Sequence, residues 1–452
     1  MSTASSSSSH DGDGDGDGGG GDFTGPSHSR QRFNSAVWPE PFLEALAIQI
    51  AVDAALSFGR LAVAPALFNI FQVCRTWRSI SQSDPLWQTL TRRIWHRHHL
   101  LHHSWYDEYI YRHRTARNFH SRRYDYTTLN FPPNDDNNNG ALSCCRLALS
   151  DYHIAAGFSD GSVRLYHLPT RLHVTTFHPH QRNHLGLYSR AVSGIFFTDN
   201  RLVFASLDGD IHVASIDVPG AAARRAHLGD VVTDGVLVDF TGCDRWWVGL
   251  YAGVPNRAFH VRNSNTEEIV FIGGTLMDPD SVDGWHLLTD LSEHIGRIRI
   301  TSDELAVGFR ITSDELAVGF ARRRVIVFNL RNQMILGDEE FRREINVGAA
   351  DAYDRALMFV NSRGVANVRQ VSSLAEICRF MARGSLLGCV NGGYCFTSVG
   401  GGIRVWELHH GEYLYILRER IGDASAMIAD ERYVAACSAD NTIHLWDFGA
   451  HI

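Results

Sequence analysis

The sequence predicts a mainly β protein, a seven-bladed β-propeller preceded by a small α-helical module and a disordered N-terminal tail. Two observations carry this prediction. Downstream of residue 142, short β-branched runs alternate with turn residues at a period of about forty. Upstream of it, between residues 36 and 95, apolar residues recur at helical spacing. With 452 residues, of which 44% are hydrophobic, the chain has room for both parts and can fill a large core.

The first segment, residues 1–33, consists mostly of Ser, Gly and Asp and includes the runs SSSSS and DGDGDGDGGGGD. It holds too few apolar side chains to offset the entropy lost on folding. We therefore predict a disordered tail.

The second segment, residues 36–95, is predicted to be a helical docking module. From Phe68 to Ile80, apolar residues recur at helical spacing, and Ser81–Pro85 then ends the helix before a new apolar segment begins at Leu86. So short a helical unit cannot bury all of its own apolar surface. We expect it to need a partner.

The third segment, residues 96–140, contains a basic stretch with interleaved aromatic residues and the turn-rich linker FPPNDDNNNG at 131–140. Its arginines and aromatic rings allow two readings: a nucleic-acid surface, or a helical connector with outward-facing guanidinium groups. The net charge of -8 favours the connector, so no nucleic-acid partner is expected. His98 with His102, and His99 with His103, are four residues apart on a possible helix, but no nearby Cys completes a zinc site. We expect no metal.

The fourth segment, residues 141–452, contains seven hairpins of the form apolar strand, turn, apolar strand. They span 154–168, 202–216, 246–261, 316–330, 356–371, 394–408 and 433–448. Trp446-Asp447 ends the last hairpin and Trp406-Glu407 the sixth, and both resemble the dipeptide of WD-type blades. The period and the turn residues predict a WD-type propeller.

A propeller must close its ring to remove open sheet edges. Because the printed chain stops just after the third strand of the last unit, we expect the missing fourth strand to come from 126–131. The undecapeptide RITSDELAVGF occurs twice, at 299–309 and 310–320, and lengthens the interval between the third and fourth hairpins. Only one copy can occupy the inner ladder. The repeat is either a genuine duplication or an error in the gene structure.

The sequence contains no G-x-S-x-G, H-E-x-x-H or phosphate-binding glycine motif, so we expect a non-catalytic protein without cofactors. The eight scattered Cys residues suit buried, reduced thiols better than disulfides. No apolar run of eighteen residues and no secretory leader is visible, so we expect no membrane partner.

The helical segment resembles an F-box. V-C-x-x-W-x-x-I followed by D-P-L-W spans 73–87, and WPEPFLEAL at 38–46 resembles the opening half. The resemblance implies docking on the Skp-type adaptor and cullin of an SCF ubiquitin ligase. The positions that it assigns to adaptor binding are Pro39, Leu43, Leu46, Val73, Cys74, Trp77, Leu86 and Trp87. A plain helical subdomain packed on the rest of the chain is the alternative.

Longer segments, among them VDFTGCDRWWVGLYAGVPNRAFH and RVWELHHGEYLY, resemble the plant STERILE APETALA family over nearly the whole chain. The resemblance implies a nuclear F-box protein that regulates transcription in flower and organ development. It also implies that repressor complexes, such as those of the PEAPOD type, are its targets. A direct transcription factor and a propeller scaffold without ligase activity remain open, and the substrate-binding residues are unknown.

All 42 basic residues are arginine, and the sequence contains no lysine. Only a lysine amine is an ordinary acceptor for ubiquitin. For a ligase subunit, this composition predicts resistance to lysine-linked self-modification. GC-rich codon usage is the alternative explanation.

Overall fold

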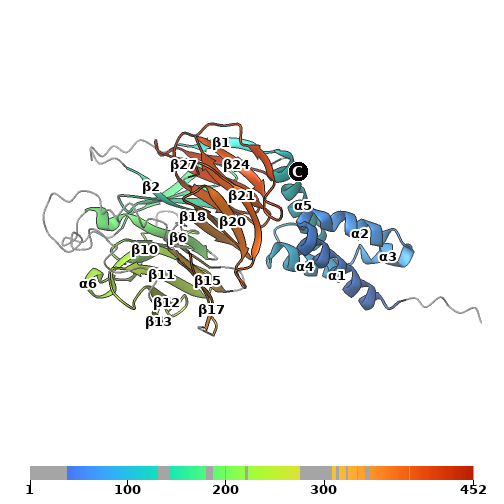
Figure 1. Cartoon of the computed structure of the whole chain (residues 1–452), viewed down its shortest axis with the longest axis horizontal. Helices are drawn as coiled ribbons and strands as arrows, with labels where there is room; N and C mark the ends of the chain where they lie inside the picture. The colour runs from blue at the N-terminus through green and yellow to red at the C-terminus, as the bar shows by residue number, and fades with distance from the viewer. Residues whose placement is uncertain are drawn as a thin grey trace, which may run out of the picture.

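The computed structural model describes residues 38–130, 142–179, 187–198, 200–218, 222–274, 308–311, 315–321, 324–332, 334–341, 347–385 and 387–450. These residues form seven four-stranded sheets in a ring, with a group of helices on one side of it (Figure 1). The predicted fold class is therefore confirmed. The tail at 1–33 and the linker at 131–140 lie outside the described residues.

The helical module begins with α1 (Glu40–Phe58), which follows Pro39 and carries Pro41 in its first turn. Proline suits this place because the first helical N–H groups have no partner within the helix. Gly59, at φ +85°, ends α1, and the short 3₁₀ helix η1 (Arg60–Ala62) leads into α2 (Val63–Phe71). The remaining helices of this part are α3 (Arg75–Ile80), α4 (Asp84–Trp95) and α5 (Trp105–Ser121).

The helix predicted across 68–80 is in fact two helices. α2 ends at Phe71, the N–H of Val73 bonds to the carbonyl of Ile70 at 3.1 Å, and Cys74 is extended (φ -162°) before α3 begins. The prediction was wrong at this point because helical periodicity continues across the turn and no Gly or Pro marks it. As a result, Val73 and Cys74 lie in a turn and are exposed.

The seven sheets are antiparallel, and each runs in chain order outward from its first strand, except the last. The first three are β2 (Cys144–Leu149), β3 (His153–Phe158), β4 (Val163–His167), β5 (Leu172–Phe177); β6 (Val192–Thr198), β7 (Arg201–Ser206), β8 (Ile211–Ser215), β9 (Arg224–His227); and β10 (Val236–Gly242), β11 (Trp246–Ala252), β12 (Phe259–Asn263), β13 (Ile269–Gly273). A short 3₁₀ helix η2 (Leu187–Arg190) precedes β6, and α6 (Val231–Asp234) precedes β10.

The next three sheets are β14 (Gly308–Ile311), β15 (Leu316–Ala321), β16 (Arg324–Asn329), β17 (Met334–Glu340); β18 (Val347–Tyr353), β19 (Ala356–Asn361), β20 (Val365–Gln370), β21 (Glu376–Met381); and β22 (Leu387–Val390), β23 (Tyr394–Val399), β24 (Gly402–Glu407), β25 (Tyr413–Ile416). The seven predicted hairpins are the second and third strands of the seven sheets. All seven are confirmed.

The ring is closed by a strand from upstream of the first blade. β1 (Asp125–Leu129) pairs antiparallel with β28 (Ile443–Asp447), from Asp125 opposite Asp447 to Leu129 opposite Ile443. β27 (Tyr433–Ser438) and β26 (Ala424–Ala429) complete this seventh sheet. The closing strand is confirmed; it starts one residue before the predicted range of 126–131, ends two residues before the end of that range, and links the two ends of the propeller.

Turn chemistry explains why the hairpins form where the sequence places them. Gly161, Gly209 and Gly364 have φ values of +86°, +85° and +74°, and Asn256 and Asn441 have +59° and +66°. Positive φ is tolerated by Gly and, among other residues, best by Asn.

The tandem undecapeptide falls in the fourth blade. β14 contains the last two residues of the first copy and the first two of the second, and β15 contains LAVGF of the second copy. The two strands pair from Gly308 opposite Phe320 to Ile311 opposite Ala317. The rest of the first copy lies outside the described residues.

Candidate functional site

The residues predicted to bind an adaptor separate into a buried and an exposed group. Leu43 and Leu86 are each 1% exposed and Trp87 is 5% exposed, so they belong to the core of the helical module. Their assignment as contact residues needs correction, because the described chain itself covers them. Trp77 is half-buried against the same core. The exposed members are Pro39, Leu46, Val73 and Cys74.

Trp87 shows what the buried group does. Its Nε1 donates a hydrogen bond to the carbonyl of Ser81 at 2.7 Å, and its ring packs on Tyr106 and Tyr109 with centroids 5.0 and 4.9 Å apart. Trp87 thereby ties the turn between α3 and α4 to α5. The D-P-L-W segment at 84–87 is a packing element of the module.

The exposed face of α1 is apolar, although α1 already buries one side. Leu43, Ala47 and Ala51 point into the core between α1, α2 and α4, whereas Trp38, Phe42 and Leu46 are 57%, 45% and 36% exposed. Phe42 and Leu46 are four residues apart on α1, and Trp38, which precedes the helix, stacks on the ring of Phe42, so the three form one stripe. We call Trp38, Phe42 and Leu46 the docking stripe.

Sequence reasoning found Leu46 but missed Trp38, Phe42 and Phe68, which is 60% exposed on α2. The signal was present, because the i, i+4 pattern of 38, 42 and 46 runs alongside the pattern of the buried residues. In Figure 1, α2, α3 and the N-terminal end of α1 project away from the sheets, whereas the C-terminal end of α1 faces the ring.

By length and composition alone, α1 could span a membrane, the one described helix that could. Glu44, Gln49 and Asp53 interrupt its apolar residues, so α1 is not an unbroken apolar run of eighteen. The burial of Leu43, Ala47 and Ala51 against α2 and α4 accounts for one side of this apolar helix.

Cys74 stands at the start of α3 and is an exposed, free thiol. The backbone N–H of Trp77, and then that of Thr76, favours the thiolate, so the pKa of Cys74 lies below its ordinary value. Cys74 is the described cysteine most accessible to labelling.

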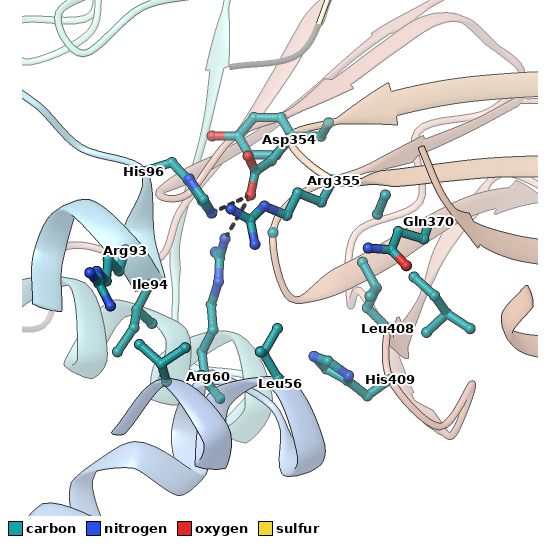
Figure 2. A pocket seen from close by; sticks show the side chains of 16 residues that line it. Leu56, Arg60, Arg93, Ile94, His96, Asp354, Arg355, Gln370, Leu408 and His409 are labelled. Carbon is teal, nitrogen blue, oxygen red and sulfur yellow. Dashed lines mark ion pairs between the residues drawn. The ribbon is translucent and has the colours of Figure 1, made fainter. Parts of the chain in front are cut away.

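A charged junction holds the helical module on the ring (Figure 2). Nη1 of Arg60 lies 2.6 Å from Oε1 of Glu431, Nη2 lies 3.6 Å from Oδ2 of Asp354, and the guanidinium sits 5.1 Å from the ring of Trp95. Burial lowers the pKa of Arg60, but pairing with Glu431 and Asp354 outweighs burial and leaves it raised. Arg60 therefore stays charged.

Two neighbours of this contact extend the junction. Nε2 of His96 lies 3.0 Å from Oδ2 of Asp354, and Arg97 forms a two-pronged ion pair with Asp151 in the first blade. Nearby, Asp430 is half-buried, and desolvation raises its pKa to about 6 despite hydrogen bonds from the backbone N–H groups of Tyr433 and Arg432. A cleft of about 260 Å³ lies beside the junction, between α1, α4 and the ring.

The basic connector packs between the module and the ring through α5. Asn118 Nδ2 donates to the carbonyl of Phe448 at 2.9 Å, Tyr394 donates to the carbonyl of Ala116 at 2.6 Å, and Phe119 stacks on Phe448 at 3.7 Å. Arg112 is buried and bonds to Glu108 at 2.8 Å. The connector reading fits these contacts. Arg114, Arg117 and Arg123 remain exposed.

The histidine spacing considered for a metal does not lie on a helix. α4 ends at Trp95, His96 has φ +51°, and His98 and His99 are exposed in the segment that follows. His102 instead lies 2.6 Å from Glu108. Among the described residues, no group of three metal-binding side chains converges.

These features define a class: a closed, WD-type seven-bladed propeller, a platform for protein–protein interaction, with an apolar helical module attached. A family model for the WD domain, G-beta repeat, matches residues 422–447, which form β26 to β28. The chain is 53% identical over 439 residues to "Transcriptional regulator STERILE APETALA" of Arabidopsis thaliana, covering 95% of this chain and 96% of that protein. The chain therefore belongs to the STERILE APETALA family.

Two solved structures are similar at low identity. The β-propeller domain of Cps50 (Swd1) from Myceliophteria thermophila is 12% identical with a TM-score of 0.49, covering 72% of this chain and 99% of that one. BamB from Moraxella catarrhalis is 11% identical with a TM-score of 0.44, covering 67% and 85%.

Proposed function

We propose that this protein is the substrate-recognition subunit of an SCF-type ubiquitin ligase in the nucleus. The helical module docks on a Skp-type adaptor and its cullin, and the ring holds a transcriptional repressor that is marked for degradation. The protein itself contributes no catalytic group. It acts by raising the effective concentration of a target lysine near the conjugating enzyme.

The docking stripe is the observation that carries this proposal. A helix that is apolar around its whole circumference is normally buried on all sides, but α1 buries one side and exposes Phe42 and Leu46 on another, with Trp38 stacked on Phe42. Exposed aromatic and aliphatic side chains that cluster on one element mark interaction surfaces. The F-box-like sequence in the same module supplies the chemical class of the partner.

Two further observations support the target side. The ring is closed, and the charged junction and α5 hold it on the side of the module away from α2 and α3, so the two ends can bind different proteins (Figure 1). The relative from Arabidopsis thaliana is named a transcriptional regulator, which favours a nuclear target in transcription, such as a PEAPOD-type repressor complex.

Direct titration of the purified full chain with a purified Skp-type adaptor tests the proposal. We expect a 1:1 complex that survives gel filtration. The absence of any complex at micromolar concentrations of both proteins would leave the helical module without the proposed partner.

A second candidate function is direct transcriptional regulation by binding DNA. The exposed arginines Arg114, Arg117 and Arg123 favour it, because basic side chains along one helix and its end can contact phosphates. Deleting 92–126 would not test it cleanly, since that range contains the buried face of α5 and part of β1. Replacing the three arginines by glutamine tests it. Loss of retention on DNA at physiological salt would support this function.

A further inference from the structure

The side chain of Arg60 reaches from the helical module to three consecutive blades. Its two carboxylate partners come from equivalent turns, Asp354 between β18 and β19 and Glu431 between β26 and β27. The blade between them contributes Gly392, in the turn between β22 and β23. One guanidinium group therefore contacts the ring over the fifth, sixth and seventh blades.

Gly392 leaves the space that the guanidinium fills. A Cβ atom at position 392 would lie 1.9 Å from Nη1 of Arg60 and 2.2 Å from its Cζ. Any larger residue at this position would displace the guanidinium from its seat. The three charged side chains are well covered, with 11% of Arg60, 9% of Asp354 and 7% of Glu431 exposed.

The module has another attachment to the ring through α5. Asn118 bonds to the carbonyl of Phe448, and Phe119 stacks on the ring of the same residue. Because α5 shares one core with α1, α2 and α4, the module moves as a body. An attachment through α5 alone would let this body pivot about Phe448, whereas a second attachment at a distance along the chain sets the angle. Arg60, in η1 just after Gly59, provides the attachment nearest to α1, and His96 and Arg97 after α4 reinforce it through Asp354 and Asp151.

We propose that Arg60 is a positioning residue that fixes the angle between the docking stripe and the ring. The consequence for catalysis rests on the proposed function: a fixed angle sets the distance between a docked adaptor and a bound target, and so selects which target lysines are reached. The fixed angle itself is a property of the free chain. It can be measured without adaptor or target.

Spin labels on the full chain test whether Arg60 fixes the angle between the module and the ring. One label is attached to Cys74, which is exposed on the module, and the other to an Asn265→Cys substitution at the exposed turn between β12 and β13. The half-buried Cys145 and Cys243 are replaced by serine to keep labelling specific. Pulsed electron double resonance then reports the distribution of distances between module and ring.

We expect one narrow distribution for the parent chain, and a distribution that is at least doubled in width or clearly shifted for Arg60→Gln. Gly392→Val fills the space that the Arg60 guanidinium occupies, so it should have the same effect although Arg60 is retained. Arg60→Lys keeps the charge but lacks the two Nη groups that reach Glu431 and Asp354 separately, so its distribution should be intermediate.

Arg93→Gln is the matched control, because Arg93 lines the same cleft, is exposed and forms no ion pair within the described ranges. It should keep the parent distribution. A narrow, unshifted distribution in both Arg60→Gln and Gly392→Val would overturn the proposal. If the variants change the distances as expected but the chain binds no adaptor, the positioning role of Arg60 is supported and the proposed ligase function is not. Failure of the positioning role and failure of the proposed function are therefore distinguishable.

Discussion

The indole ring of Trp38 stacks on the phenyl ring of Phe42, with centroids 4.7 Å apart, although the two side chains are 57% and 45% exposed. Stacking orders the pair without burying it. An exposed aromatic pair that is already ordered loses little side-chain entropy when a partner covers it. This pair is therefore the expected centre of adaptor binding.

Replacing Phe42 and Leu46 together by alanine should weaken adaptor binding by at least about tenfold, since each exposes apolar area that a partner would bury. The free energy of unfolding should change by less than about 1 kcal/mol, because both side chains are exposed. Calorimetric titration and urea denaturation measure the two quantities. Leu56→Ala with Phe58→Ala is the control at the far end of α1, where both residues are also exposed. Equal loss of binding in both pairs would contradict a role specific to the docking stripe.

Trp87→Ala should act differently, by unfolding the module. Deleting a buried tryptophan costs about 3–5 kcal/mol, and here it also removes the hydrogen bond to Ser81. Hydrogen exchange should show lost protection in α3 and α4 while the sheets keep theirs. Native protection in both helices would show that Trp87 is not a structural residue of the module.

Leu129→Ala should loosen the closure of the ring. Leu129 is 2% exposed and lies opposite Ile443 in the strand pair that joins the two ends of the propeller. Loss of its buried side chain should cost about 2–5 kcal/mol and lower the melting temperature. Thr128→Ala, on the exposed side of the same strand, should leave the melting temperature nearly unchanged. An effect of equal size in the two variants would contradict the role of β1 as a packed closing strand.

Asp430 makes stability depend on pH. Its pKa of about 6 in the folded chain lies above its ordinary value of 3.8, so the folded state holds the proton more tightly than the unfolded state. The resulting contribution to stability is complete below pH 3.8 and is lost as the pH rises to 6, amounting to at most about 3 kcal/mol. Asp430→Asn should therefore gain stability relative to the parent chain at pH 7.5 compared with pH 5. Denaturation curves at both pH values measure this difference, and a difference of the opposite sign would refute it.

Arg78→Lys tests the consequence of a chain without lysine. Arg78 is exposed in α3 and makes no ion pair within the part of the chain that the structure describes, so lysine should fit there without loss of stability. In a reconstituted ligase, this variant should acquire ubiquitin while the parent chain does not. Abundant adduct on internal residues of the parent chain, or none on the variant while a target is modified, would contradict the idea.

The ring could be predicted well because each blade repeats the same local signals. Gly161, Gly209 and Asn441 sit at turns that need positive φ, and the runs on either side of each are apolar. Even the closing strand followed from the need to remove an open edge. Local chemistry and global topology agree throughout this part.

The helical module was harder to predict because its sequence pattern does not tell buried from exposed apolar residues. Trp87 and Leu46 read alike in the sequence, yet one is in the core and the other on the surface. The turn at Cys74 interrupts no periodicity, so it left no signal. Arg60 gave none either, because its partners Asp354 and Glu431 are about 300 and 370 residues away in the chain.

The most direct test is affinity purification of the full chain from cell extract, beside its Phe42→Ala/Leu46→Ala variant. It asks whether the helical module binds a ligase and the ring binds a target. We predict that the parent chain brings down a Skp-type adaptor and a cullin, and that the variant loses both while keeping proteins bound to the ring. Equal recovery of adaptor and cullin with both chains would contradict the account, and so would recovery with neither chain.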